Sequence, residues 1–237
     1  MFPTSVVNLL YPPTCLLCRA PLPSGAVCEE CAAAMPERPR PVCAYCGVGL
    51  PGAFDAVAVC AYCRRRLPRF ERARAPWLYA GVVQDAIRRF KYQRRWRIGR
   101  WLADAMSLTA RASLPLAEVS AVLPVPLHWL KRRLKGWNPA EELAAAVARS
   151  LDKPCRPSAL RRTRWTATQT RLGWRARSRN VRAAFAARPR LVRDQTILLI
   201  DDVLTSGATA DACALALRAA GARRVFVLTA ARTPLHE

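Results

Sequence analysis

The stretch TILLIDDVLTSGATADACALAL, residues 196–217, decides the fold. Its first five residues are apolar or β-branched and predict a buried strand that ends in two adjacent carboxylates, Asp201 and Asp202. The segment from Ala208 to Gly221 predicts a helix that glycine closes. In an open α/β sheet, ligands bind at the carboxyl ends of the strands. The stretch therefore places a candidate ligand site between residue 201 and the helix.

The loop between strand and helix is suited to a phosphate group. Thr205, Ser206 and Thr209 supply hydroxyl donors, and Gly207 allows close approach of the backbone. Backbone N–H groups and the partial positive charge of the helix N-terminus favour an anion at this place. Two carboxylates beside such a loop suit a sugar diol, a magnesium ion or both, so we interpret the site as one for a sugar phosphate.

The rest of the C-terminal region alternates between the two kinds of element. Residues 119–126 and 224–232 predict strands, 139–151 predict a helix, and 82–114 have helical spacing with a break near Arg94. This alternation predicts an α/β fold with a mostly parallel sheet flanked by helices. Residues 64–77, which are polar and contain two prolines, are interpreted as a linker. The expected domains are therefore 1–67 and 76–237.

The N-terminal segment holds eight of the ten cysteines, arranged as four C-x2-C pairs. Two such pairs can complete a tetrahedral zinc site. The order predicts two zinc ribbons in tandem, although a cross-braced pairing of the four knuckles also fits. A lattice of disulfides is the alternative that the regular spacing disfavours. Four thiolates leave no open position on the ion, so both zinc ions would be structural. The predicted ligands are Cys15, Cys18, Cys28 and Cys31 for the first ribbon and Cys43, Cys46, Cys60 and Cys63 for the second.

The chain is strongly basic, with 39 Lys and Arg against 16 Asp and Glu and a formal net charge of +23. Arginine codon usage in a GC-rich genome is one explanation, and an anionic partner is the other. Arginines are interleaved with aromatic residues around Trp96 and Trp101, around Trp129 and Trp137, and within residues 156–193. This pattern suits single-stranded nucleic acid, whose bases stack on aromatic rings. We expect Trp96 and Trp101 to be packed on a helix instead.

The N-terminus lacks a basic region followed by a cleavage site, so no secretory signal is expected. No apolar run reaches the roughly 18 residues that a membrane span requires. We therefore expect a cytoplasmic protein without a membrane span.

The order strand, Asp-Asp-Val, Thr-Ser-Gly-x-Thr resembles the signature of type I phosphoribosyltransferases. The resemblance implies that Asp201 and Asp202 hold the ribose hydroxyls of phosphoribosyl pyrophosphate, with Mg²⁺ bound alongside, and that the following loop holds its 5-phosphate. The residues that it assigns to substrate binding are Val203, Leu204, Thr205, Ser206, Gly207, Ala208 and Thr209.

Two further blocks narrow the resemblance. LPVPLHWLKRRLKGWNPAEELA and LRRTRWTATQTRLGWRARSRNVRAAF, together with the cysteine knuckles, resemble the ComF family, a double zinc ribbon joined to a type I phosphoribosyltransferase domain. Trp137, Pro139 and the Leu-Thr-Ser order of the loop are mild departures from its pattern. In the second block Arg179 is expected to bind substrate, on an arm over the site where basic side chains neutralise departing pyrophosphate.

The ComF resemblance implies a role in natural competence, the uptake of external DNA as a single strand. Single-stranded DNA and a competence helicase or another uptake protein are then the expected partners. Two alternatives stay open. The protein could be an active phosphoribosyltransferase on an unidentified amine or base, or a non-catalytic adaptor that docks through its zinc ribbons.

Overall fold

The computed structural model describes residues 13–37, 39–52, 57–127, 133, 136–163 and 184–234. Its centre is a five-stranded sheet in the order β1-β7-β6-β3, with β2 also paired to β7 and every pairing parallel. The strands are β1 (Arg72–Arg74), β2 (Trp77–Leu78), β3 (Ala121–Pro124), β6 (Thr196–Leu204) and β7 (Arg224–Arg232). The predicted fold class, a mostly parallel sheet flanked by helices, is confirmed.

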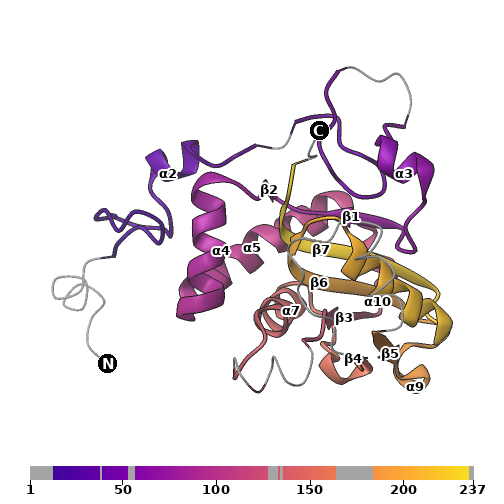
Figure 1. Ribbon diagram of the computed structural model, residues 1–237. Coiled ribbons are helices and arrows are strands. Elements are labelled where there is room, and N and C mark those ends of the chain that lie inside the picture. The colour runs from indigo at the N-terminus through magenta and orange to yellow at the C-terminus, as the bar shows by residue number, and fades with distance from the viewer. Residues whose placement is uncertain are drawn as a thin grey trace.

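Helices cover both faces of this sheet (Figure 1). One face carries α4 (Gly81–Gln93), α5 (Trp96–Ser113) and α7 (Pro139–Ser150). The other face carries α10 (Ala208–Ala219) and the antiparallel pair of β4 (Leu160–Arg162) and β5 (Phe185–Ala187). The remaining short elements are α2 (Glu29–Ala33), α3 (Ala61–Arg65), α9 (Pro189–Val192) and the 3-10 turns Leu116–Glu118 and Pro157–Ala159.

The side chains of β6 alternate between the two hydrophobic cores. Leu198 and Ile200 pack with α4, α5 and α7, whereas Ile197 and Leu199 pack with α10. All four are fully buried, as expected of a strand covered on both faces. This continuous apolar run is the reason the sequence identified the central strand without ambiguity.

The predicted break near Arg94 is confirmed. Arg94 adopts the left-handed conformation, with φ of 50°, and ends α4. The chain then turns and α5 begins at Trp96, so one amphipathic stretch becomes two packed helices. Among the described helices, none is both long and apolar enough to cross a membrane.

The segment interpreted as a linker is instead part of the sheet. Arg72–Arg74 pairs with β7 from Phe226 to Leu228, and Trp77–Leu78 continues along the same edge. Pro76 interrupts the two short strands because proline has no N–H for the ladder. The sequence did not reveal these strands because they are too short to show an alternating pattern. They form because they pair with the long strand β7. The domain boundary at residue 67 stays a prediction.

The two ribbons lie beside different parts of the sheet domain (Figure 1). Cys15, Leu17 and Cys31 of the first ribbon belong to the same buried cluster as α4 and α5. In the second ribbon, Tyr45 O accepts a hydrogen bond of 2.6 Å from Ala73 N of β1. A Cβ at Gly47 would lie 2.5 Å from Ala73 O, which shows how closely the second ribbon approaches this edge strand.

We predict that Gly99→Ala destabilises the protein although alanine favours helices. A Cβ at Gly99 would lie 2.5 Å from Cε2 of Phe90, which is fully buried and edge-on to Trp137 at 5.2 Å. Overpacking costs about 1–3 kcal/mol, and the gain in helix propensity is about 1 kcal/mol. Chemical denaturation should therefore show a net loss of stability.

The double variant Gly99→Ala with Phe90→Leu is the matched comparison, because the smaller side chain makes room for the new methyl group. The double variant should then lose less stability than the two single variants lose in sum. A Gly99→Ala variant as stable as the natural protein would contradict the close packing of α4 on α5.

Candidate functional site

The site begins where β3 ends and β6 continues. Pro124, the last residue of β3, is level with Ile200, and Val125 N donates a hydrogen bond of 2.8 Å to Ile200 O. Beyond that point β6 runs on against β7 as far as Leu204, opposite Arg232. The strand predicted from the sequence ends at residue 201, which is too early, because β6 extends to Leu204. Pairing with the long β7 keeps β6 extended past Asp201 and Asp202. On its other side, β6 has no β3 partner beyond Ile200.

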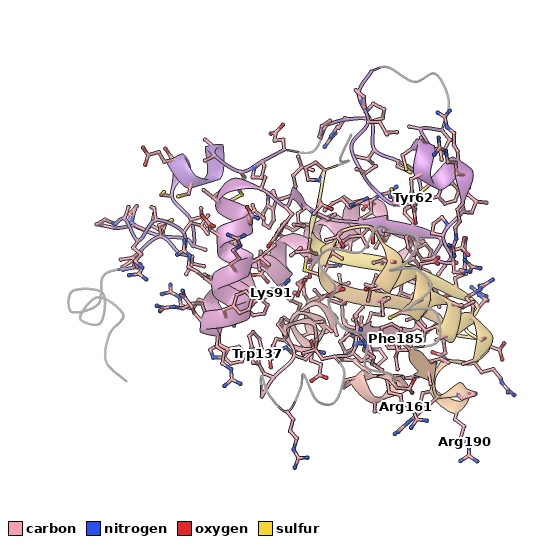
Figure 2. The ribbon with its side chains drawn as sticks, in the orientation of Figure 1. Tyr62, Lys91, Trp137, Arg161, Phe185 and Arg190 are labelled. Carbon is pink, nitrogen blue, oxygen red and sulfur yellow. The ribbon has the colours of Figure 1, made fainter. Side chains whose placement is uncertain are left out.

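The two carboxylates of the acidic pair have different surroundings. Asp202 Oδ1 lies 2.7 Å from Nζ of Lys91, in the last turn of α4 (Figure 2). Both side chains are mostly buried, with exposures of 17% and 21%. Burial alone would lower the pKa of Lys91, but the charges of Asp202 and Asp201 outweigh it and raise that pKa. The ammonium group therefore stays charged and ties α4 to the end of β6.

Asp201 belongs to the opposite face of the sheet, because successive residues of a strand alternate. Burial and then the neighbouring Asp202 carboxylate raise the pKa of Asp201 to about 7, against the opposing effects of Lys91, the Asp202 N–H and Arg162. The Asp202 N–H donates to Asp201 Oδ1 at 2.8 Å. The same environment raises the pKa of the buried Cys213 thiol, through burial and then the Asp201 charge.

The loop after β6 is short. Gly207 has φ of 77°, a conformation that side chains rarely adopt, and α10 starts at the next residue. Ala208 N lies 3.4 Å from Ser206 Oγ, and Thr205 is exposed. The first N–H groups of a helix lack intrahelical acceptors, so they are directed into this loop. The loop thus joins a left-handed glycine to the start of a helix, and its role as an anion site stays a prediction.

Arg232 fixes the start of the loop from within. This buried arginine donates from Nη1 to Leu204 O at 2.9 Å and to Thr233 O at 3.0 Å, and it also contacts Thr205 O. Its Nε is buried without a hydrogen-bond partner among the described residues. A guanidinium held on loop carbonyls adds positive charge beneath the candidate phosphate position.

The second ribbon forms a wall beside the same loop. Asp211, in the first turn of α10, accepts a hydrogen bond of 2.7 Å from Arg69 N and lies 3.5 Å from Nη2 of Arg66. A small hollow between them is lined by Cys46, Tyr62, Cys63, Arg66, Leu67, Pro68, Phe70, Ser206, Gly207 and Asp211. The ribbon is thus attached to the helix whose N-terminus completes the loop.

The eight predicted metal ligands assemble as two four-cysteine clusters in tandem, which rules out the cross-braced pairing. Within each cluster the Sγ atoms all lie within 4.8 Å of one another. The Cys18–Cys28 and Cys46–Cys60 sulfur pairs are 3.6 and 3.7 Å apart. Four sulfurs at the Zn–S bond length around a tetrahedral ion would be about 3.8 Å apart. The donor set and its spacing therefore fit two structural zinc sites.

Backbone N–H groups surround the cysteine sulfurs. Leu17 N and Cys28 N each lie 3.4 Å from Cys15 Sγ, and Cys60 N lies 3.4 Å from Cys43 Sγ. Burial opposes ionisation of Cys15, but hydrogen bonds from Cys18, Cys28 and Leu17 outweigh it and lower the pKa to about 6. Donors of this kind stabilise the thiolate that binds metal.

Most of the predicted site residues come together at the end of β6. Asp201, Asp202 and the loop occupy one edge of the sheet, whereas Arg179 lies outside the described residues. Lys91 and Arg232 are two residues of the site that the sequence did not predict. Arg232 was recoverable, because it ends a predicted strand at the same edge as the acidic pair. Lys91 gave a weaker signal. It is one of only 4 lysines in the chain, and it lies near the end of a predicted helix.

Comparison with known proteins finds a family model over the ribbon segment and relatives over nearly the whole chain. A family model described as a double zinc ribbon domain matches residues 6–64. DNA utilization protein YhgH of Escherichia coli (strain K12) is 31% identical over 230 residues, covering 95% of this chain and 99% of the relative. Competence protein F of Haemophilus influenzae is 29% identical over 227 residues, covering 92% and 96%.

Two solved structures are also similar at low identity. An allosteric regulatory enzyme of purine biosynthesis gives a TM-score of 0.39 at 22% identity and covers 56% of this chain. A glutamine phosphoribosylpyrophosphate amidotransferase from B. subtilis, complexed with ADP and GMP, gives 0.41 at 19% identity and covers 60%. This chain spans 25% and 30% of those two proteins.

Fold and site together define a double zinc ribbon joined to a parallel α/β domain, in which an acidic strand end precedes a glycine-containing loop. A relative that is 31% identical over 95% of this chain shows the family to which the chain belongs. The chain belongs to the ComF family, with YhgH and competence protein F among its relatives.

We predict that Asp201→Asn stabilises the protein in a pH-dependent way. The folded pKa of about 7 exceeds the usual value for aspartate, so folding binds a proton, and stability falls as pH rises from about 4 to about 7. Asparagine cannot ionise. The gain in Tm over the natural protein should therefore be larger at pH 8 than at pH 5.5, by about 2–4 °C for each kcal/mol relieved.

Asp104→Asn, an exposed change on α5, is the control and should shift Tm equally at both pH values. A Tm difference for Asp201→Asn that does not change with pH would show that this carboxyl titrates normally.

We predict that the protein purified under reducing conditions carries two zinc ions per chain, one for each cysteine cluster. Cys18→Ser and Cys46→Ser should each leave about one ion, because three thiolates hold zinc less firmly than four. Cys155→Ser, outside both clusters, should leave two. Mass spectrometry of metals gives the count, and zinc-free natural protein would overturn the assignment.

Proposed function

We propose that this protein binds phosphoribosyl pyrophosphate, or a closely similar sugar phosphate, at the carboxyl end of β6. The observation that carries the proposal is the position of Asp201 and Asp202, just past the end of β3 and directly before a glycine-containing loop and a helix N-terminus. Ligands of open α/β sheets bind at such a place. The loop from Thr205 to Thr209 would hold the 5-phosphate, with Arg232 behind it.

The acidic pair supports the ribose and metal half of the same proposal. Asp201 and Asp202 would bind the ribose hydroxyls and the Mg²⁺ that accompanies pyrophosphate. The ion neutralises pyrophosphate oxygens when bound. Lys91 holds Asp202 in place, and it would set the position of one carboxylate before the ligand arrives. Turnover with an amine or base acceptor would follow from the same site, and pyrophosphate release is its signature.

We further propose that the protein works in DNA uptake or utilization, in contact with single-stranded DNA and in the cytoplasm. Relatives over nearly the whole chain are named DNA utilization protein and competence protein F. The formal net charge of +23 favours a polyanionic partner. The cytoplasm is where cysteine thiols stay reduced and available to zinc.

We predict that Asp201→Asn combined with Asp202→Asn weakens binding of phosphoribosyl pyrophosphate with Mg²⁺ at least about tenfold, the loss of roughly one charge-assisted interaction. Binding of inorganic phosphate should persist or strengthen, because two negative charges leave the pocket. Isothermal titration calorimetry measures both affinities.

Asp104→Asn is the matched control, since it removes an exposed carboxylate from α5 and should change neither affinity. The double variant should first be shown to be folded and to carry its zinc. Unchanged sugar-phosphate affinity in that protein would rule out the proposed role of the acidic pair.

A further inference from the structure

A basic groove separates the first ribbon from the corner where α4 meets α5. Its volume is about 710 Å³. The sugar-phosphate site described above uses none of the side chains that line it. The lining residues are Thr14, Cys15, Leu16, Arg19, Arg89, Gln93, Arg94, Arg95, Trp96, Arg97 and Ile98.

The charge of this groove has one sign. Five of the lining residues are arginines, and none of the described lining residues is acidic. They come from two separate parts of the chain, the first knuckle and the α4–α5 corner. Arg19, Arg95 and Arg97 are exposed, so their guanidinium groups can meet a ligand without leaving a buried position. A concave surface lined this way concentrates negative charge from solution.

An exposed tryptophan accompanies the arginines. Trp96 is 51% exposed, which corrects the expectation that it would be packed, whereas Trp101 is stacked on Trp77 at 4.7 Å. Trp96 is supported edge-on by Trp137 at 5.3 Å. Tyr92, at the start of the corner, is 72% exposed. Large aromatic surface left in water beside guanidinium groups is suited to stacking against bases.

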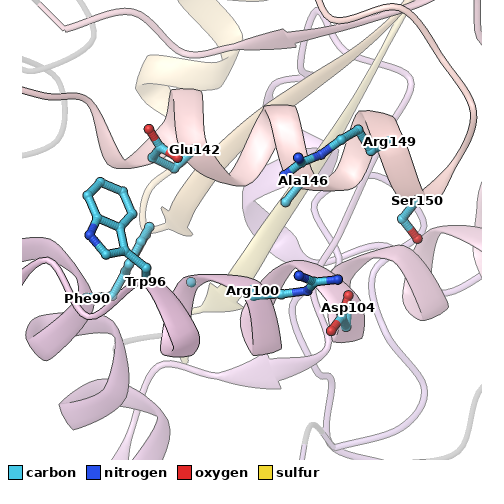
Figure 3. Close-up of a pocket in the computed structure, with 9 residues that line it drawn as sticks. Phe90, Trp96, Arg100, Asp104, Glu142, Ala146, Arg149 and Ser150 are labelled. Atoms are coloured by element: carbon cyan, nitrogen blue, oxygen red, sulfur yellow. The ribbon is translucent and has the colours of Figure 1, made fainter. Parts of the chain in front are cut away.

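Trp96 also borders a second hollow, which extends the surface between α5 and α7 (Figure 3). This hollow has a volume of about 570 Å³ and is lined by Arg100 and Arg149 together with Asp104 and Glu142. Its mixed charge does not favour a polyanion. The tryptophan therefore stands at the rim of the basic groove, where an extended ligand would enter or leave.

The groove is held in shape before any ligand binds. Arg89 donates to Leu16 O at 3.3 Å and to Leu17 O at 2.6 Å, which joins the first knuckle to α4. Arg94 ends α4 in the left-handed conformation and lies over the Trp137 ring at 5.7 Å. A preformed groove loses little conformational entropy on binding.

We infer that this groove is a binding site for single-stranded nucleic acid, with phosphates on the arginines and a base stacked on Trp96. The inference rests on the proposed contact with single-stranded DNA and assigns it a place. Duplex DNA would offer its phosphates but no unstacked base to the ring. An acidic protein would be bound by the arginines alone, so the tryptophan distinguishes these ligands.

The first arm of the test measures charge. Binding of fluorescein-labelled oligo-dT is followed by anisotropy between 50 and 300 mM salt. Arg95→Ala with Arg97→Ala should weaken binding and make the log–log salt slope shallower by about 0.7 for each lost contact, about 1.4 in all. The control is Arg190→Ala with Arg218→Ala, which removes two exposed arginines from α9 and α10 and should leave the slope unchanged. In Figure 2, Arg190 lies at the lower right edge of the molecule, away from Trp137.

The second arm measures stacking. Trp96→Ala should weaken binding about 5- to 150-fold with an unchanged salt slope, and Trp96→Phe should restore most of the affinity. The side chain is half exposed, so the variant should fold, and zinc content and circular dichroism check this. A 20-base-pair duplex should bind without sensitivity to Trp96→Ala.

The outcomes separate this inference from the sugar-phosphate proposal. Groove variants should keep the affinity for phosphoribosyl pyrophosphate, and the Asp201/Asp202 variant should keep oligo-dT binding. The inference fails if the natural protein does not bind oligo-dT, or if the Arg190/Arg218 control loses as much as the groove variant. It also fails if Trp96→Ala has no effect and polyglutamate competes as well as oligo-dT does, which would make the groove a site for acidic proteins.

Discussion

The parallel pairing of β6 with β7 is the constraint on which the rest of the structure depends. It runs from Thr196 opposite Arg224 to Leu204 opposite Arg232, whereas the pairing of β6 with β3 stops at Ile200. The excess length carries two carboxylates beyond the neighbouring strand and holds them in extended backbone. The same pairing places Arg232 beside the loop that follows β6. Without this difference in strand length, the acidic pair would be enclosed within the sheet.

Extended backbone also explains why the two carboxylates have different properties. Neighbouring residues of a strand point to opposite faces, so Asp202 meets Lys91 of α4, while Asp201 lies near Arg162 of β4. One carboxylate is neutralised by an ion pair and the other has its pKa raised by burial. A ligand cation or a sugar hydroxyl at this edge would therefore meet one carboxylate that is paired with a lysine and one whose pKa is raised.

Helix α4 connects regions that the sequence keeps far apart. Its last turn places Lys91 on the acidic pair, and Arg89 of the preceding turn holds the first zinc knuckle. The second ribbon is attached through Arg66 and Arg69 to Asp211, beside the loop that follows β6. Both ribbons therefore pack against helices of the α/β domain, the first on α4 and the second on α10. Loss of metal from a ribbon is expected to disturb the neighbouring surface, because these hydrogen bonds end on ribbon backbone or on residues next to it.

The sequence by itself determined the two cysteine clusters, the central strand, the break between helices near Arg94 and the glycine-containing loop after Asp202. Each is a local pattern whose spacing carries its own physical reason, such as knuckle geometry or a continuous apolar run. The tertiary structure alone decided the order of the short edge strands, the exposure of Trp96 and the partnership of Lys91 with Asp202. These depend on contacts between residues far apart in the chain. Neither periodicity nor composition specifies which distant side chain meets a given carboxylate.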